Sequence, residues 1–270
     1  MKFAFSTLGC PEWSWNEMVA TAKDLGYDGI EIRGIANELY VPKTTPFLPE
    51  NIQKTKAMLK EKNLEISMFT SVVSFHNKDN IARHMAAGRE YIDLAHEAEV
   101  PFIRVMCEQT ADPQLDIDLG FASENYAKLA EYAQGSGVTV LMETNGALAN
   151  TKKMRAFISP LEASGLPVGV LWDIHHPFRF FGESIQTTYD NIGEFIKYIH
   201  IKDSVMENGQ VKYKMLGKGD IPNKELLIFL NNNHYKSYVS LEWVRRWNKD
   251  LEAAGIVFPH FIRYVRNIVK

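Results

Sequence analysis

Cysteine and long apolar runs are scarce in this sequence of 270 residues, which contains only two cysteines. Cys10 and Cys107 are too few for a disulfide framework or a thiolate zinc site, and we interpret them as small buried apolar residues. No apolar run approaches the roughly 18 residues that a membrane helix needs. The sequence therefore predicts neither a disulfide-stapled protein nor a membrane-spanning one.

An excess of charge of one sign is also lacking. The 30 Lys and Arg residues nearly balance 33 Asp and Glu residues, which gives a formal net charge of -3. The basic residues are scattered, so no footprint for a phosphate backbone is visible, and we expect no nucleic-acid partner. Residues 1–15 have only a short apolar stretch and are followed closely by acidic side chains, unlike a secretory signal. A cytoplasmic location is the resulting expectation.

The composition is that of an ordinary globular protein, with 46% hydrophobic and 23% charged residues. No linker, low-complexity tract or shift in composition divides the chain. A chain of this length can build one large core. We therefore expect a single domain that spans residues 1–270.

Short apolar or β-branched runs recur along the chain and alternate with stretches of helical spacing. One such stretch carries Ile81, Met85, Ile92 and Ala95 on one face. The expected strands are residues 3–6, 29–32, 65–69, 102–106, 138–142, 169–172, 198–201 and 238–241. Eight βα units in a chain of this length predict the α/β class and a closed (β/α)8 TIM barrel.

The longer stretches without helical spacing follow predicted strands, at residues 33–49, 107–120, 175–183 and 203–222. In a barrel, loops of this kind share the C-terminal face, where active sites are assembled. We expect them to cover a substrate.

Four predicted strands in the second half of the chain end in candidate metal ligands. These are Glu143, Asp173, His200 and Glu242, separated by 30, 27 and 42 residues. Each taken alone is more often a solvated or hydrogen-bonded residue. Together, carboxylate and imidazole groups without thiolates favour Mn²⁺, Mg²⁺, Co²⁺ or Zn²⁺, and an ion would give two strand-buried carboxylates a partner. The pattern predicts one divalent-metal site.

Two further polar residues extend these strand ends. His176 is preferred over His175 as a substrate contact or weak further ligand, because successive strand-like residues alternate sides. Lys202 is interpreted in two ways, as a group that neutralises a developing oxyanion or holds a substrate hydroxyl, or as the partner of Asp203 or of a neighbouring strand in an ion pair.

Weaker candidates lie on the first four strands. Glu31 and Arg33 are expected to contact substrate or to form a structural ion pair, and His76 and Glu108 are fainter candidates. An aromatic wall for a sugar-sized ligand is also considered, although barrel rims use aromatic residues as packing at least as often. Its members would be Trp13, Trp15, Phe69, Trp172 and Trp243.

With these residues identified, the chain resembles the xylose isomerase-like barrel superfamily, and within it the sugar phosphate isomerase/epimerase group. Ketose 3-epimerases, hydroxypyruvate isomerases and inosose dehydratases belong to that group. The similarity spans nearly the whole chain, and its most specific parts are residues 142–143, 173–176, 200–203 and 241–242, with 217–220 resembling the group's Gly-x-Gly rim.

The resemblance implies that Glu143, Asp173, His200 and Glu242 bind the metal, that His176 touches substrate, and that Glu143 and Glu242 transfer the proton. Endonuclease IV, a DNA-repair relative, uses more histidines than this chain offers, because residues 205–218 contain none. Ketohexose epimerases place an Arg shortly after the histidine that His200 matches, and this chain does not. The substrate of that subgroup is therefore not transferred.

The expected function is that of a metal-dependent sugar isomerase or epimerase, which abstracts a proton next to a carbonyl through a metal-stabilised enediolate. Mn²⁺ is the first choice of cofactor, with Co²⁺, Mg²⁺ and Zn²⁺ as alternatives. An inosose-type dehydratase acting on a cyclic polyol is the main alternative, and a non-catalytic sugar-binding barrel is another. The expected partner is a small sugar or polyol, and a homodimer is a family-level expectation.

Overall fold

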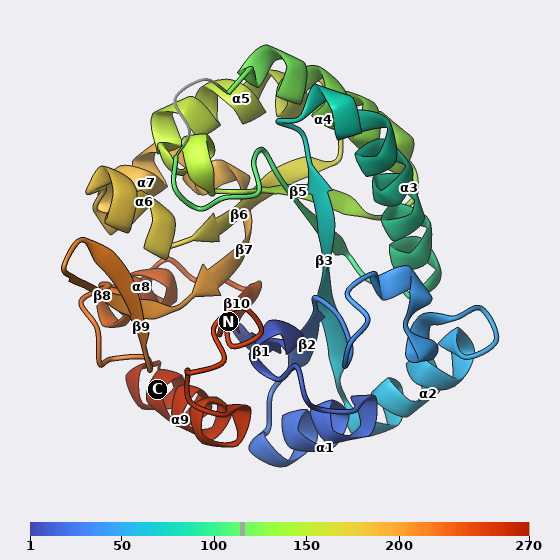
Figure 1. Ribbon diagram of the computed structural model, residues 1–270, viewed down its shortest axis with the longest axis vertical. Coiled ribbons are helices and arrows are strands. Elements are labelled where there is room, and N and C mark those ends of the chain that lie inside the picture. Colours follow the sequence, from blue (N-terminus) through green and yellow to red (C-terminus); the bar gives the residue numbers. More distant parts are fainter. Residues whose placement is uncertain (114–116, 270) are drawn as a thin grey trace.

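Eight parallel strands close into one barrel in the computed structural model, which describes residues 1–113 and 117–269 (Figure 1). Around the barrel the strands follow the order β1-β10-β7-β6-β5-β4-β3-β2. They are β1 (Lys2–Ser6), β2 (Gly29–Ile32), β3 (Glu65–Ser74), β4 (Phe102–Met106), β5 (Thr139–Glu143), β6 (Val168–Asp173), β7 (Ile196–Ile201) and β10 (Tyr238–Leu241). The predicted TIM barrel is confirmed.

Helices form a ring around the strands, as Figure 1 shows. They are α1 (Trp15–Leu25), α2 (Ile52–Lys62), α3 (Ile81–Glu97), α4 (Leu119–Ala133), α5 (Thr151–Ala163), α6 (His175–Phe181), α7 (Ile185–Ile192), α8 (Asn223–Asn232) and α9 (Ala254–Ile268). Local sequence fixes their ends. In α1, Ser14 and Glu17 cap each other's backbone at the N-terminus, and Gly26 closes the helix with a φ of 71°.

Two of the predicted loops are wrong, because they contain regular structure. Residues 175–183 include helix α6, and residues 203–222 include a hairpin of β8 (Asp203–Glu207) and β9 (Gln210–Lys214). The hairpin turns at Asn208 and Gly209, whose φ angles of 51° and 74° are the left-handed values that a two-residue turn requires. The predicted loop 107–120 includes residues 114–116, which lie outside the described residues.

The barrel interior is built in two layers, because inward-facing residues alternate along each strand. The lower layer is apolar and forms a cluster of its own, made of Ala4, Met68, Phe102, Leu141, Leu171, Tyr198 and Tyr238. Two residues further along each of these strands, the upper layer is polar and buried, with Ser6, Thr70, Arg104, Glu143, Asp173, His200 and Ser240. The upper layer lies at the C-terminal ends of the strands.

A second and larger apolar core joins the outside of the barrel to the helices. Phe258 of α9 stacks on Phe5 of β1 with ring centroids 4.2 Å apart, and Trp13 meets the same Phe258 edge-on at 5.6 Å. Within the described parts of the chain, no helix combines the length and the apolar character needed to cross a bilayer.

Candidate metal centre

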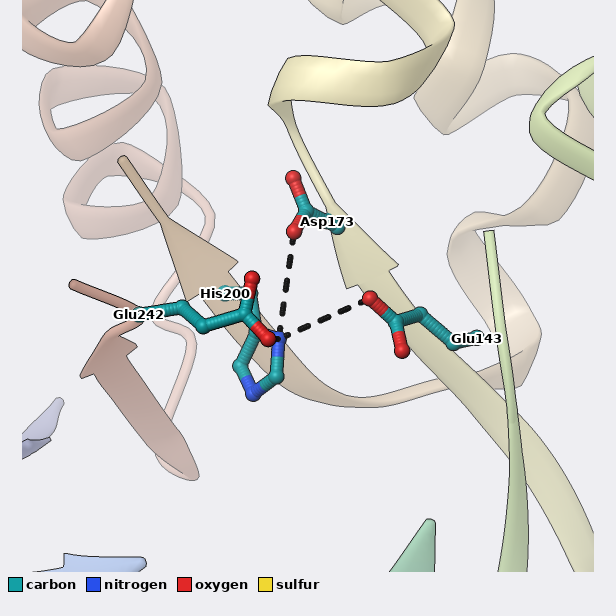
Figure 2. Close-up of side chains that lie close together, drawn as sticks. All are labelled: Glu143, Asp173, His200 and Glu242. Carbon is teal, nitrogen blue, oxygen red and sulfur yellow. Dashed lines mark ion pairs between the residues drawn. The ribbon is translucent and has the colours of Figure 1, made fainter. Parts of the chain in front are cut away.

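Four neighbouring strands bring the predicted ligands together. Glu143 ends β5, Asp173 ends β6, His200 lies near the end of β7, and Glu242 directly follows β10. Asp173 and His200 are direct partners in the parallel register of β6 and β7. All four side chains are buried, and one ligand atom of each lies within 4.8 Å of the others. Figure 2 shows the three carboxylates converging on the His200 ring.

The Nδ1 atom of His200 is at the centre of this cluster. It lies 3.8 Å from Glu143 Oε1, 3.8 Å from Asp173 Oδ2 and 3.6 Å from Glu242 Oε1. Among the described residues it has no hydrogen-bond partner, although it is fully buried. These spacings are a few tenths of an ångström longer than the roughly 3 to 3.5 Å between ligands around one small cation, so a small inward movement of the side chains would let them share one ion. The four residues therefore fit a divalent ion.

Glu31 lies behind the histidine. Its Oε2 atom is 2.9 Å from His200 Nε2 and also accepts from Tyr198 Oη at 3.1 Å, while Thr70 Oγ1 donates to Oε1 at 2.9 Å. A carboxylate on the far nitrogen of a ligating histidine fixes the ring and its tautomer. Of the two expectations for Glu31, this position fits the structural ion pair across the barrel, with His200 as the partner, and not the substrate contact, because the carboxylate lies in the layer beneath the ligands.

The cluster carries charges of both signs. Burial raises the pKa of Glu143, but the neighbouring Arg104 and His200 outweigh it and hold the pKa at about 2. Burial likewise opposes ionisation of Glu242, and Lys202 with His200 lowers its pKa below the usual value. Burial lowers the pKa of Lys202, yet Asp173 and Glu242 raise it well above the usual value. Both glutamates are therefore ionised at neutral pH.

Lys202 reaches into the cluster and not toward its sequence neighbour. Its Nζ atom lies 2.6 Å from Asp173 Oδ2, donates to Glu242 Oε2 and is 3.3 Å from His176 Nε2. Asp203 instead accepts from the backbone N–H groups of Gly217 at 2.8 Å and Gly219 at 3.0 Å. Of the predicted ion-pair partners of Lys202, Asp203 is therefore wrong, whereas a partner on a neighbouring strand is confirmed by Asp173 of β6. Asp203 closes the base of the hairpin loop.

His176 and His175 begin helix α6, so the expected strand-like alternation does not apply to them. The two rings nevertheless have different partners. His176 lines the cavity above the cluster, with its Nε2 atom 3.6 Å from Asp173 Oδ2. His175 Nε2 lies 2.9 Å from Ser204 Oγ of the hairpin instead.

A cavity of about 380 Å³ opens above the ligands. Its wall includes Glu143, Glu242, Lys202 and His176 of the predicted set. The aromatic groups on it are Tyr213 of the hairpin and Trp247, and not the predicted ones: Trp13 packs on Phe258, while Phe69, Trp172 and Trp243 are almost fully buried. The predicted aromatic wall is therefore placed on the wrong residues.

Arg104 is the main residue of this site that the sequence analysis missed. It lies on β4 in the upper layer, is 5% exposed and lines the cavity. Its Nε atom is 3.2 Å from Glu143 Oε2. The signal was present, because an Arg within the apolar run Phe-Ile-Arg-Val-Met would be costly to bury without an acidic partner or a ligand. Glu108, a fainter candidate, accepts a hydrogen bond from the Ala147 backbone instead.

Comparisons with known proteins agree with this architecture. A sequence model described as the xylose isomerase-like TIM barrel matches residues 19–257. Fructoselysine 3-epimerase from Shigella flexneri is 22% identical over 258 residues, which is 90% of each chain. A probable 3-DHS dehydratase from Bacillus anthracis superposes with a TM-score of 0.79 at 17% identity, covering 99% of both chains.

The IOLI protein, whose structure holds a zinc atom, superposes with a TM-score of 0.78 at 17% identity, covering 100% of this chain and 98% of that one. These structural likenesses extend over whole chains and establish the fold. The family match spans most of the chain and includes strands β2 to β10 of the barrel. On these grounds, the chain belongs to the xylose isomerase-like TIM barrel family.

Proposed function

We propose that this protein is a divalent-metal-dependent isomerase or epimerase of a small sugar or sugar-like keto compound. One observation carries the proposal: three buried carboxylates converge on a buried His200 Nδ1 that has no hydrogen-bond partner in the described chain. Lys202 and Arg104 pair with the carboxylates from outside, but Glu143 Oε1, Glu242 Oε1 and His200 Nδ1 face one another without a shared partner in the described chain, which is costly to bury. The 22% identical epimerase relative supports the reaction class.

Glu143 and Glu242 are the proposed proton-transfer pair. They approach the centre from opposite sides of the His200 ring (Figure 2), so one can remove a proton from a bound sugar and the other can return it. Arg104 and Lys202 keep them ionised and aimed through the contacts at Glu143 Oε2 and Glu242 Oε2. His176 and Lys202 border the same space and are placed to hold substrate oxygens.

The metal is proposed to be held by Glu143, Asp173, His200 and Glu242, with Mn²⁺ as the first choice. When bound, a divalent ion supplies Lewis-acid stabilisation of the negative charge that develops as a proton leaves the carbon next to a carbonyl. Glu31 would orient the His200 ring for this role.

A dehydratase is the second candidate. It begins with the same proton abstraction and then expels a hydroxyl group from the neighbouring carbon. The structural neighbour described as a probable dehydratase supports it, as does His176, which lies near Lys202 and is placed to protonate a leaving hydroxyl. NMR analysis of the product separates the two candidates, because dehydration loses water whereas epimerisation keeps the mass.

Metal analysis tests the site. The purified protein is expected to hold about one equivalent of Mn, Co, Mg or Zn, and the Asp173→Ala, His200→Ala double variant is expected to lose it. His175→Gln is the matched control, since His175 is equally buried but bonds Ser204, and it should keep the metal. A wild-type protein that is metal-free and also fails to bind added Mn²⁺ would overturn the proposal.

Proton exchange tests the chemistry. Ketoses and inososes are incubated with the metal-loaded protein in D₂O, and exchange of the proton next to the carbonyl is followed by NMR. Glu143→Gln and Glu242→Gln are each expected to slow exchange by about 10²- to 10⁴-fold. Rates within a few-fold of wild type would remove these roles. Binding of a sugar without any exchange would indicate the non-catalytic alternative.

A further inference from the structure

The wall of the cavity is divided by charge. One side carries Glu143 and Glu242 with the rest of the metal cluster, and the other side carries two arginines, Arg33 after β2 and Arg104 on β4. The proposed reaction uses the acidic side. The reaction assigns no role to a second guanidinium group, although burying such a group costs free energy unless an anion pairs with it.

Arg104 is only partly satisfied by the protein. Its Nε atom forms an ion pair with Glu143 Oε2 at 3.2 Å, although this contact lacks hydrogen-bond geometry. Its Nη1 atom is buried and has no hydrogen-bond partner among residues 1–113 and 117–269. An arginine offers a fork of donors that suits carboxylate and phosphate oxygens, so a buried free arm beside a cavity points to a ligand oxygen.

Arg33 adds a second cation to the same wall. Its Nη1 atom donates to the Leu39 carbonyl at 3.3 Å, and its guanidinium lies 5.8 Å from the centre of the Trp247 ring. No carboxylate forms an ion pair with it within the described residues. Burial lowers the pKa of Arg33, and Arg104 lowers it further, to about 10. Arg104 therefore disfavours the charge on Arg33, and Tyr91 and Glu242 offset this effect only in part.

The balance of charge in the cavity also favours a bound anion. Three cationic side chains, Lys202, Arg33 and Arg104, offset the three carboxylates of the cluster. His200 and Glu31 form a separate pair below them. A His200 that ligates an ion through Nδ1 is neutral, so Glu31 adds a fourth negative charge, and a divalent ion in the cluster then leaves an excess of one positive charge. A bound anion would remove that excess, whereas a neutral sugar would leave it buried.

We propose that the substrate carries an anionic group, a carboxylate or a phosphate, which is bound by Arg104 and Arg33 on the side of the cavity formed by β2 and β4, next to Glu143. The inference rests on the proposed function for the location of the reacting carbons and narrows the substrate class to acidic sugars or sugar phosphates. The keto end lies at Glu143 and Glu242, and the anionic end lies at the arginines.

Binding of three matched probes tests this assignment. D-glucitol is neutral, D-gluconate carries a carboxylate, and D-glucitol 6-phosphate carries a phosphate on the same six-carbon chain. Isothermal titration calorimetry is run on the Mn²⁺-loaded wild type, on Arg33→Gln and on Arg104→Lys. Arg246→Gln is the control, because Arg246 also donates to a backbone carbonyl, that of Ala36, but does not line the cavity.

At least one anionic probe is expected to bind wild type about tenfold or more tightly than D-glucitol, as a charge-assisted bidentate contact allows. Arg33→Gln should reduce that preference to within roughly threefold and leave D-glucitol affinity unchanged. Arg104→Lys should weaken the anion more than D-glucitol, because lysine keeps the charge and loses the fork. The probe that responds identifies carboxylate or phosphate as the group.

The proposal is overturned if neither anion binds more tightly than D-glucitol, or if Arg33→Gln and Arg246→Gln behave alike. Equal losses for all three probes in Arg104→Lys would indicate that Arg104 only positions Glu143. The titrations are repeated after chelator treatment, where an arginine-dependent preference should persist. An anion preference in a protein that shows no metal or proton exchange would retain the anion site and reject the proposed function, so the two failures are distinguishable.

Discussion

The two interior layers of the barrel come from the same strands but are held together by different forces. In the lower layer, Leu171, Leu141 and Met68 are buried among apolar neighbours and are stabilised by packing. In the upper layer, Glu143, Asp173 and His200 are buried equally well, yet they are stabilised only by ion pairs, hydrogen bonds and the proposed metal. The apolar layer is complete by itself, whereas the charged layer leaves a set of ligand atoms that the proposed metal would join.

The spacing between the layers explains how one strand can serve both. On β5, Leu141 is followed two residues later by Glu143, and on β6 Leu171 is followed by Asp173. Because side chains two apart point to the same face of a strand, each pair occupies one column of the interior. The lower residue packs in the apolar layer and fixes the position of the strand, and this places the upper residue at the proposed metal site.

The largest effect that separates the layers is expected from Leu171→Ala. The truncation leaves a cavity in the apolar layer and should lower the free energy of unfolding by about 2–5 kcal/mol. Metal stoichiometry of the folded protein should not change. Denaturant unfolding and metal analysis measure the two properties, with Ile228→Ala as the control, since Ile228 is 41% exposed and should cost much less. Metal loss without destabilisation would contradict the separation of roles.

Glu31→Gln is expected to act on the charged layer instead, by lowering the affinity for the metal. The variant preserves the shape of the side chain but removes the carboxylate from His200 Nε2, so the affinity for Mn²⁺ should fall by about 10- to 100-fold. Competition with a chelating dye measures the affinity. Glu61→Gln, an exposed surface change, should leave it unaltered. An unchanged affinity in Glu31→Gln would show that the charge behind His200 is dispensable.

The smallest effect is expected from Tyr198→Phe, because Tyr198 belongs to both layers. Its ring packs in the apolar cluster, while its hydroxyl group lies 2.8 Å from Ser67 Oγ and 3.1 Å from Glu31 Oε2. Removing the hydroxyl should cost about 1 kcal/mol of unfolding free energy and alter Mn²⁺ affinity only slightly. Tyr132→Phe, at an exposed tyrosine, is the control. A loss of metal comparable to that of Glu31→Gln would place Tyr198 in the ligand layer.

The barrel and the cluster geometry could be predicted from sequence because both follow from strand periodicity. Eight apolar runs define the strands, and the residues at the ends of four of them, such as Asp173 and His200, must meet at one mouth of a closed barrel. Whether Glu31 faces substrate or supports a ligand could not be predicted, since both positions bury a carboxylate at a strand end. Only the three-dimensional register places it behind His200.

Other features were missed for different physical reasons. Arg104 interrupts an apolar strand, and its acidic partner Glu143 lies 39 positions away, so no local pattern reveals the pair. The hairpin at 203–214 had a local signal in Asn208-Gly209, flanked by alternating polar and apolar residues, but it was interpreted as a loop. Its strands form a separate two-stranded sheet outside the barrel, from which Tyr213 reaches the cavity wall.

Asp203 closes the base of that hairpin without contacts from the residues of the hairpin tip, and this has an evolutionary consequence. Its carboxylate ties the backbone of Gly217, Gly219 and Ile221 to the end of β7, so the base of the segment is closed whatever residues lie above it. Descendants of this chain can lengthen, shorten or exchange residues 205–216 without a change in any barrel strand. The segment carries Tyr213 to the cavity wall, so such exchanges would alter ligand preference while the scaffold is inherited unchanged.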